Sequence, residues 1–351
     1  MDIAARAEAL RQSLRANPPK RLLVLCREHI GDLGNTTAGI WAIRQNFTSA
    51  HLVVEVGERA ISVLENFPGI DETWPRPTHQ GLMLKLLRLK QMRAAKFDLC
   101  VILDDSNSMV QWARWAKIPR VAGVWRGVKH EGLFDAYVPL VEEMHEVRDH
   151  NRALLELMGL DVSDFRPRLF PSALDFEVAD EALREVGLAG PFVAIHPGAS
   201  EPARRWPVER FGAVARRLIE EGHSVLVLGG PGEEALLEDV LSASSSRAKK
   251  LERKLTVMQL AALLSKASLL VCNDTGPMHI AGAMGTQVAG LFGVTNPSHT
   301  GPYGEGHSLI RGSCPCSPRS LNNCSGECMR SIGVEQVVEA AQSQLSTISE
   351  S

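Results

Sequence analysis

The sequence predicts an α/β protein with two doubly wound domains, because apolar runs typical of buried strands alternate with helical segments. The same alternation starts again in the second half of the chain. In addition, loops containing Gly, Pro and polar residues follow the strands, as expected at the ligand-binding edge of parallel sheets. The length of 351 residues favours two domains over one.

Strands and helices alternate through the first half of the chain. Apolar runs predict buried strands at 21–26, 51–57, 98–105 and 120–125. Helices are expected near the N-terminus, after a glycine-bearing turn within 27–47, and at 59–70, 110–117 and 143–160. This order predicts βαβ units on one parallel sheet.

The pattern restarts after a polar, proline-bearing stretch at 161–176, which we interpret as a linker. Helices at 177–188 and 208–222 and strands at 191–198, 268–276 and 287–293 are expected, with a strand, glycine turn and helix over 224–242. We therefore expect domains over 1–172 and 173–351, joined near 165–180.

The composition excludes several classes of function. A formal net charge of −3 argues against a general nucleic-acid binder, which is usually basic. No stretch approaches the roughly 18 consecutive apolar residues of a membrane span. The polar N-terminus has neither the apolar core nor the cleavage pattern of a signal peptide. We therefore expect a cytoplasmic protein.

The segment 81–96 is both basic and apolar, since it carries Lys and Arg residues and no acid among Leu and Met residues. Two interpretations are open. A basic amphipathic helix lies on an anionic membrane, whereas an ordinary surface helix packs on the sheet and leaves its basic face in water.

The loop after the strand at 191–198 combines a Pro-Gly turn with Ser200, Arg204 and Arg205. Glycine lets the backbone approach a ligand closely, and arginine binds phosphate oxygens in pairs. The alternative is a solvated arginine pair in a surface loop. Trp206 is interpreted as a packing residue.

A glycine turn at 228–234 enters the next helix and ends in Glu233. The turn lacks the G-x-G-x-x-G spacing of a dinucleotide site, which disfavours an NAD enzyme. The carboxylate of Glu233 either accepts hydrogen bonds from ribose hydroxyls or is a first-turn acid favoured by the helix dipole.

The stretch 271–286 interrupts a buried strand with polar residues and begins a helix of small residues. Backbone N–H groups at such a helix start bind anions, and His279 adds a donor one turn later. A capped turn with a core histidine is the alternative. The residues expected at this phosphate site are Asp274, Thr275, Gly276, Pro277 and His279.

The first-half loop at 27–37 carries an acid, Asp32, between a glycine and a helix of small residues. One interpretation is a helix cap. The other is a general base that takes a proton from an acceptor hydroxyl.

These four segments, "REHIGDLGNTT", "HPGASEPARRWPVERF", "LGGPGE" and "VCNDTGPMHIAGAMGTQVAGLFGVTNPSHTGPYG", resemble the heptosyltransferases of glycosyltransferase family 9. The resemblance spans nearly the whole chain in the family's order. It implies a GT-B fold, in which two Rossmann-like domains face each other across a cleft. It also implies that the second domain binds the donor and the first binds the acceptor. A final helix that packs back on the first domain is a further expectation.

The resemblance also implies roles for single residues. Asp32 matches the family's base, with Gly31, Asn35 and Thr36 on the acceptor side. Glu233 matches the residue that holds the ribose, and Thr275, Gly276 and His279 match the segment that binds the diphosphate. Arg204 stands where the family usually has Lys, so a planar fork replaces a point charge.

The implied reaction is an inverting, metal-independent transfer of heptose from ADP-L-glycero-D-manno-heptose to a lipid-linked lipopolysaccharide core at the inner face of the cytoplasmic membrane. Negative charge grows on the departing diphosphate, where Arg204 and a helix N-terminus stabilise it. Closure of the cleft is part of the expected cycle. A non-catalytic sugar-nucleotide module and a transferase that uses another nucleotide sugar are the alternatives.

The seven cysteines fall into two groups. Cys26, Cys100 and Cys272 lie in or beside apolar runs and are expected to be buried thiols. Four others are spaced C-x-C-x7-C-x3-C, which matches structural zinc motifs imperfectly. A structural zinc or iron, a disulfide and free thiols are open alternatives for Cys314, Cys316, Cys324 and Cys328.

Overall fold

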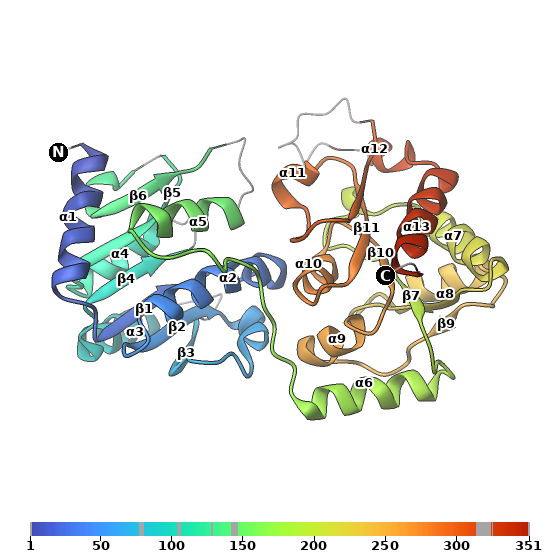
Figure 1. Cartoon of the computed structure of the whole chain (residues 1–351), viewed down its shortest axis with the longest axis horizontal. Helices are drawn as coiled ribbons and strands as arrows, with labels where there is room; N and C mark the ends of the chain where they lie inside the picture. The colour runs from blue at the N-terminus through green and yellow to red at the C-terminus, as the bar shows by residue number, and fades with distance from the viewer. Residues whose placement is uncertain are drawn as a thin grey trace. The chain divides into compact units, whose positions relative to one another are not determined.

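The computed structural model describes residues 2–76, 81–103, 107–127, 129–141, 147–313, 324 and 326–349. Contacts within the chain divide it into two compact units, Met1–Arg168 and Leu169–Ser351 (Figure 1). The division falls four residues before the expected boundary at 172. Within the described ranges, no helix combines the length and apolar character needed to cross a bilayer.

The first unit is built on a parallel six-stranded sheet with the order β3-β2-β1-β4-β5-β6. The order reverses between β1 and β4, which makes their carboxyl ends a topological switch point. The strands are β1 (Arg21–Leu25), β2 (His51–Gly57), β3 (Glu72–Arg76), β4 (Leu99–Ile102), β5 (Arg120–Trp125) and β6 (Ala136–Pro139).

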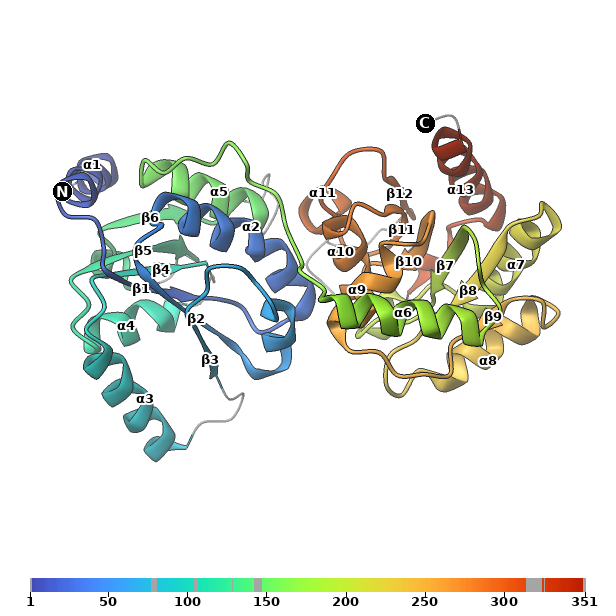
Figure 2. The ribbon, with the colours of Figure 1, turned by 60° about the horizontal axis from the view of Figure 1, so that its bottom comes forward.

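Helices cover both faces of this sheet (Figure 2). α2 (Ile30–Asn46) and α5 (Arg148–Leu157) pack together on one face, and α3 (Leu82–Ala95) and α4 (Asn107–Trp115) lie on the other. α1 (Ile3–Ala16) contacts β6, and 3₁₀ turns occur at η1 (Glu58–Leu64) and η2 (Glu131–Leu133). The helix expected at 59–70 is therefore only a 3₁₀ turn.

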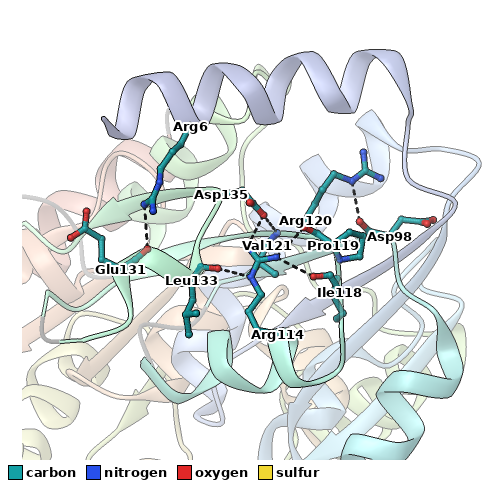
Figure 3. Close-up of polar contacts among 10 residues, drawn as sticks. All are labelled: Arg6, Asp98, Arg114, Ile118, Pro119, Arg120, Val121, Glu131, Leu133 and Asp135. Atoms are coloured by element: carbon teal, nitrogen blue, oxygen red, sulfur yellow. Dashed lines mark hydrogen bonds and ion pairs between the residues drawn. The ribbon is translucent and has the colours of Figure 1, made fainter. Parts of the chain in front are cut away.

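Partly buried polar contacts hold the strands of this sheet at their amino ends (Figure 3). The guanidinium of Arg114, at the end of α4, donates to the Asp135 carboxylate at 2.8 Å and to the carbonyl of Leu133 at 2.7 Å. The same carboxylate accepts the backbone N–H of Val121 in β5 at 2.7 Å. Arg120 donates to the carbonyl of Asp98 at 3.0 Å, which links β5 to β4. These contacts join α4, the turn before β6, β5 and the residue before β4 at one end of the sheet.

The second unit repeats the architecture, with a parallel sheet ordered β12-β11-β10-β7-β8-β9. Numbered within the unit, this is the same order as in the first sheet, and its switch point lies between β7 and β10. The strands are β7 (Phe192–His196), β8 (Ser224–Val227), β9 (Lys249–Lys250), β10 (Leu269–Asn273), β11 (Gln287–Phe292) and β12 (Ser308–Arg311).

Two groups of helices flank this sheet. α9 (Val257–Leu264) contacts both α6 (Ala173–Glu185) and α10 (Gly276–Ala283). α7 (Val208–Glu220) contacts α8 (Glu234–Ala243) and α13 (Val334–Ser349) on the other side. Short helical turns occur at η3 (Pro202–Arg204), α11 (Pro297–Thr300) and α12 (Glu327–Arg330).

The linker interpreted at 161–176 is shorter than expected. α6 begins at Ala173, inside that stretch, because Ser172 and Asp175 form a reciprocal capping box. Val337, Ala341 and Leu345 of α13 are buried in the core of the second unit, and packing of this last helix on the first unit stays a prediction. An apolar helix face is satisfied by the nearest uncovered sheet face.

The two groups of cysteines are described to different extents. Cys26, Cys100 and Cys272 are fully buried, as predicted, and burial raises the pKa of the Cys100 and Cys272 thiols. The sulfurs of Cys324 and Cys328 lie 3.5 Å apart. Cys314 and Cys316 lie outside the described residues, so the three alternatives for the four cysteines stay open.

Replacing Asp135 with Ala should lower the free energy of unfolding of the first unit by about 1–3 kcal/mol, because it leaves the buried N–H of Val121 without an acceptor. Urea titration followed by tryptophan fluorescence suits this test, since five of the six tryptophans lie in the first unit. Glu65→Ala, at an exposed acid in the same unit, is the control. Equal stability of the two variants would show that the Asp135 network is dispensable.

Candidate functional site

The second unit gathers polar side chains where β7 and β10 end side by side. The strands pair in parallel, with His196 opposite Cys272. The loop after β7 and the loop after β10 therefore start next to each other. They carry most of the residues predicted to bind the donor, which is the position where doubly wound sheets bind ligands.

Asn273, the last residue of β10, joins the two loops. Its side chain is fully buried, and its amide nitrogen donates to the carbonyl of Pro197 at 2.8 Å. Its amide oxygen accepts the backbone N–H of Trp206 at 3.0 Å. Both ends of the loop 197–206 are thus held by one side chain. A buried amide with both ends satisfied fixes a loop more strongly than surface contacts do.

The carboxylate of Glu233 lies against the start of the same loop. Its Oε2 is 3.3 Å from Nε2 of His196 and accepts the N–H of Gly230 at 2.7 Å. A Cβ at position 198 would stand 1.9 Å from Oε1, so a larger residue there would displace the Glu233 carboxylate from this position. The hydrogen bond from His196, helped by Gly230 and the charge of Arg205, lowers the pKa of the Glu233 carboxyl.

Arg204 lies beside the end of β10, paired with Asp274. Its Nη1 is 3.2 Å from the Asp274 carboxylate, which is 4% exposed and also accepts the hydroxyl of Thr300 at 3.3 Å. Asp274 therefore lies behind the guanidinium and orients it. In the described part of the second unit, the buried side-chain nitrogens without a hydrogen-bond partner are Nε of Arg204 and Nδ1 of His196. Since a buried guanidinium N–H is normally paired, Nε of Arg204 is suited to donate to an incoming ligand. Nδ1 of His196, whose Nε2–H faces Glu233, is suited to accept a hydrogen bond.

α10 starts at Gly276, with Thr275 as its N-cap residue in extended conformation. The Thr275 side chain makes no capping hydrogen bond, and Pro277 has no N–H to offer. A plain threonine-capped turn is therefore not formed. Residues 275–277 at the start of α10 are partly exposed. The positive end of the helix dipole is therefore accessible there, as an anion site requires.

The remaining donor-side candidates differ in exposure. Ser200 is exposed at the outer part of the loop, and Nε of Arg205 donates to the carbonyl of Ala199 at 2.8 Å, which braces the loop from within. His279 is 9% exposed, one turn into α10. Trp206 is buried in the core, as interpreted from the sequence. Whether Ser200, Arg205 and His279 touch a ligand stays a prediction.

In the first unit, Asp32 lies in the first turn of α2, at the carboxyl end of β1. The N-cap of this helix is His29, so Asp32 is not the cap residue. Its carboxylate is 31% exposed and 3.5 Å from Nη1 of Arg27. This carboxylate is therefore reachable by a hydroxyl and lies beside a cation.

The other acceptor-side candidates separate into surface and buried residues. Gly31 is partly exposed next to Asp32. Asn35 and Thr36 are 3% and 0% exposed, and the Thr36 hydroxyl donates to the carbonyl of Asp32 at 2.8 Å. In this structure Asn35 and Thr36 therefore lie inside the fold and support the turn that carries Asp32.

Sequence reasoning predicted a role for the Pro-Gly turn that contains Gly198, but it did not single out His196, Asn273 or Arg27. The role of Asn273 depends on the pairing of β7 with β10 and on a side-chain contact with Pro197. The role of His196 depends on its contact with Glu233, and that of Arg27 on its contact with Asp32. Within the described ranges, no group of His, Cys, Asp and Glu has the geometry of a metal site.

Two Rossmann-like units of one strand order are the architecture of the GT-B fold, which solved structures of similar fold share. A family model described as glycosyltransferase family 9 (heptosyltransferase) matches residues 86–330. The chain therefore belongs to glycosyltransferase family 9, the heptosyltransferase family, as the sequence motifs indicated.

Similar proteins agree with this assignment. The chain is 25% identical to lipopolysaccharide heptosyltransferase 2 of Salmonella typhimurium, over 83% of this chain and 88% of that protein. The crystal structure of a family 9 glycosyl transferase from Veillonella parvula matches with a TM-score of 0.83 and 24% identity, covering 93% of this chain and 97% of that one. E. coli ADP-heptose lps heptosyltransferase II matches with a TM-score of 0.73 and 21% identity, covering 94% and 99%.

The pair formed by Glu233 and His196 should stabilise the second unit in a pH-dependent way. A lowered pKa in the folded state contributes stability above the ordinary value of 4.5, and this contribution is lost as the pH falls through the folded value. Glu233→Gln should therefore lower the free energy of unfolding by about 1–2 kcal/mol at pH 6.5, and by progressively less as the pH falls below 4.5.

Scanning calorimetry can measure this effect, with Glu209→Gln as an exposed control on α7. A difference between Glu233→Gln and the wild type that is unchanged from pH 6.5 to pH 4 would contradict the assigned interaction.

Proposed function

We propose that this glycosyltransferase moves heptose from ADP-L-glycero-D-manno-heptose to a lipopolysaccharide core acceptor, with inversion at the anomeric carbon. Membership of family 9 and the names of the similar proteins from Salmonella and E. coli support the substrate pair. The observation that carries the proposal is the buried, unpartnered Nε of Arg204 beside the N-terminal end of α10. A diphosphate satisfies both features.

The donor half of the reaction belongs to the second unit. Departure of ADP leaves positive charge on the sugar and adds negative charge to the diphosphate. Arg204, oriented by Asp274, and the first turn of α10 stabilise that charge without reorganising during the reaction. Glu233, placed by His196 and Gly230, offers its second carboxylate oxygen to ribose hydroxyls. On this proposal catalysis requires no divalent ion.

The acceptor half belongs to the first unit. Asp32 takes the proton of the attacking hydroxyl as the new glycosidic bond forms, and inversion follows from attack on the face opposite the leaving group. Arg27 keeps a positive charge 3.5 Å from this carboxylate and restricts its orientation. We further propose that the acceptor is lipid-linked and that the enzyme works at the inner face of the cytoplasmic membrane.

Arg204→Ala should weaken binding of ADP-heptose by about 10- to 100-fold, the loss expected for charged hydrogen bonds. Arg204→Lys should recover part of the affinity, because a point charge replaces the fork. Calorimetric titration with ADP-heptose, UDP-glucose and GDP-mannose measures this, with Arg216→Ala on the exposed face of α7 as control. Selective binding of another nucleotide sugar would move the enzyme to a different donor. No effect of Arg204→Ala would refute the diphosphate site.

Asp32→Asn should lower the rate of transfer by about 10²- to 10⁴-fold, since it removes the general base and keeps the shape of the side chain. Donor affinity should stay unchanged, because Asp32 belongs to the other unit. Single-turnover assays with a core acceptor separate the two quantities, and Glu58→Gln is an exposed control in the first unit. A rate within tenfold of wild type would exclude Asp32 as the base.

A further inference from the structure

Large apolar side chains are unusually exposed on one helix of the first unit. Nine such side chains are more than a third exposed among the described residues, and six of them lie on α3 or at the end of α4. We call five of these the apolar ridge: Leu82 (75% exposed), Met83 (75%), Leu86 (59%), Leu87 (55%) and Trp115 (51%). Contiguous exposure of this kind marks an interaction surface.

The ridge is not needed to hold α3 on the sheet. The guanidinium of Arg88 pairs with the buried carboxylate of Glu55 on β2 and lies 4.9 Å from the ring centroid of Trp112. Met92 is fully buried one turn later, and Leu89 packs against the same core. These three residues of α3 face inward.

The opposite face of α3 follows from helical spacing. Residues three and four apart share a face, which groups Met83, Leu86, Leu87 and Lys90. All four are exposed. Because Arg88 and Met92 already anchor the helix, folding alone does not account for three large apolar residues on its outer face.

A shallow groove connects the ridge to α4. Leu82, Leu86 and Trp115 line it together with Leu89 and Trp112. The two helices are joined next to it by the side chain of Arg93, which donates to the carbonyl of Trp115 at 2.9 Å. The ridge is therefore one continuous surface formed by two helices that lie side by side (Figure 2).

The charge around the ridge has a single sign. α3 and its cap carry the exposed cations Lys85, Lys90, Arg93 and Lys96, and the segment 81–96 contains no acid. Lys117 joins Arg93 and Lys96 around a second hollow beside Phe97. The whole chain has a formal net charge of −3, so the charge of this surface is opposite in sign to that of the chain. A ligand of complementary chemistry is apolar and anionic.

We propose that the apolar ridge docks the protein on the surface of an anionic lipid bilayer, with α3 lying in the plane of the interface. Interfacial helices bury Leu, Met and Trp at the acyl boundary while Lys and Arg contact anionic headgroups. The inference deepens the proposed function, on which its purpose rests: a lipid-linked acceptor is met at such a surface. Vesicle binding is measured without donor or acceptor, so the two proposals fail separately.

The test is flotation of the full chain with vesicles of phosphatidylcholine alone or with about one third phosphatidylglycerol. We expect binding to the anionic vesicles only, weakened by salt. Joint replacement Leu86→Gln and Leu87→Gln should abolish it. Joint replacement Lys85→Gln and Lys90→Gln should reduce it by about fivefold per lysine.

Matched controls lie in the second unit. Leu174→Gln alters a leucine on α6 that is 66% exposed, and Lys249→Gln alters an exposed lysine. Both should bind vesicles like wild type. Thermal melting of every variant checks the fold, which these exposed positions should leave unchanged.

Three results would overturn the docking proposal. The first is equal binding to both kinds of vesicle, and the second is binding that the α3 variants do not alter. The third is self-association in sedimentation velocity that the leucine variant abolishes while no vesicle binding occurs, which would make a second copy the occupant. Transfer to a delipidated core acceptor, measured in parallel, reports on the proposed function alone.

Discussion

The buried side chain of Asn273 is the contact on which the donor-side geometry depends. One amide holds both ends of the loop 197–206, so the end of β10 determines where the loop after β7 lies. That loop carries Arg204 and packs Gly198 against Glu233. A loop of this length costs conformational entropy to order, and a satisfied buried amide offsets that cost without occupying the surface offered to a ligand.

The two units present different side chains at the same point of one strand order, which fits the two roles proposed for them. In the second unit the switch point is enclosed by buried polar groups that orient one another, such as Asp274 behind Arg204. In the first unit the switch point carries a partly exposed acid beside a cation, Asp32 and Arg27. A rigid, preorganised cluster suits a leaving diphosphate, whose charge must be met as it forms. An accessible carboxylate suits a bulky acceptor that arrives from solvent.

In the first unit, a buried carboxylate determines where two arginine side chains lie. Glu55 is 2% exposed and is flanked by Arg88 and by Arg76, whose Nη1 is 3.6 Å from its carboxylate. A lone buried carboxylate would be unfavourable, so both guanidinium groups belong to the core rather than to the surface. Arg88 is thereby withdrawn from the basic face of α3, and the remaining cations surround exposed Leu and Met residues.

Apolar runs alone predicted the eight interior strands of the two sheets, because a parallel strand covered on both faces is apolar at nearly every position. The four edge strands, β3, β6, β9 and β12, were not predicted. Edge strands are partly exposed, and their polar or proline-bearing sequences, such as 72–76, resemble loops. The capping box at Ser172 was readable in the sequence, but its proline-bearing surroundings indicated a linker.

The sequence by itself determined the fold class, the repeated architecture, the family and the loops that carry polar chemistry, since these follow from periodicity and from local motifs. Only the tertiary structure decided which side chains in those loops lie together. Asn273, His196 and Gly198 act through neighbours on another strand, and Thr36 is buried by packing that no local pattern records. Contacts between distant segments arise when strands pair, and strand pairing is a property of the whole sheet.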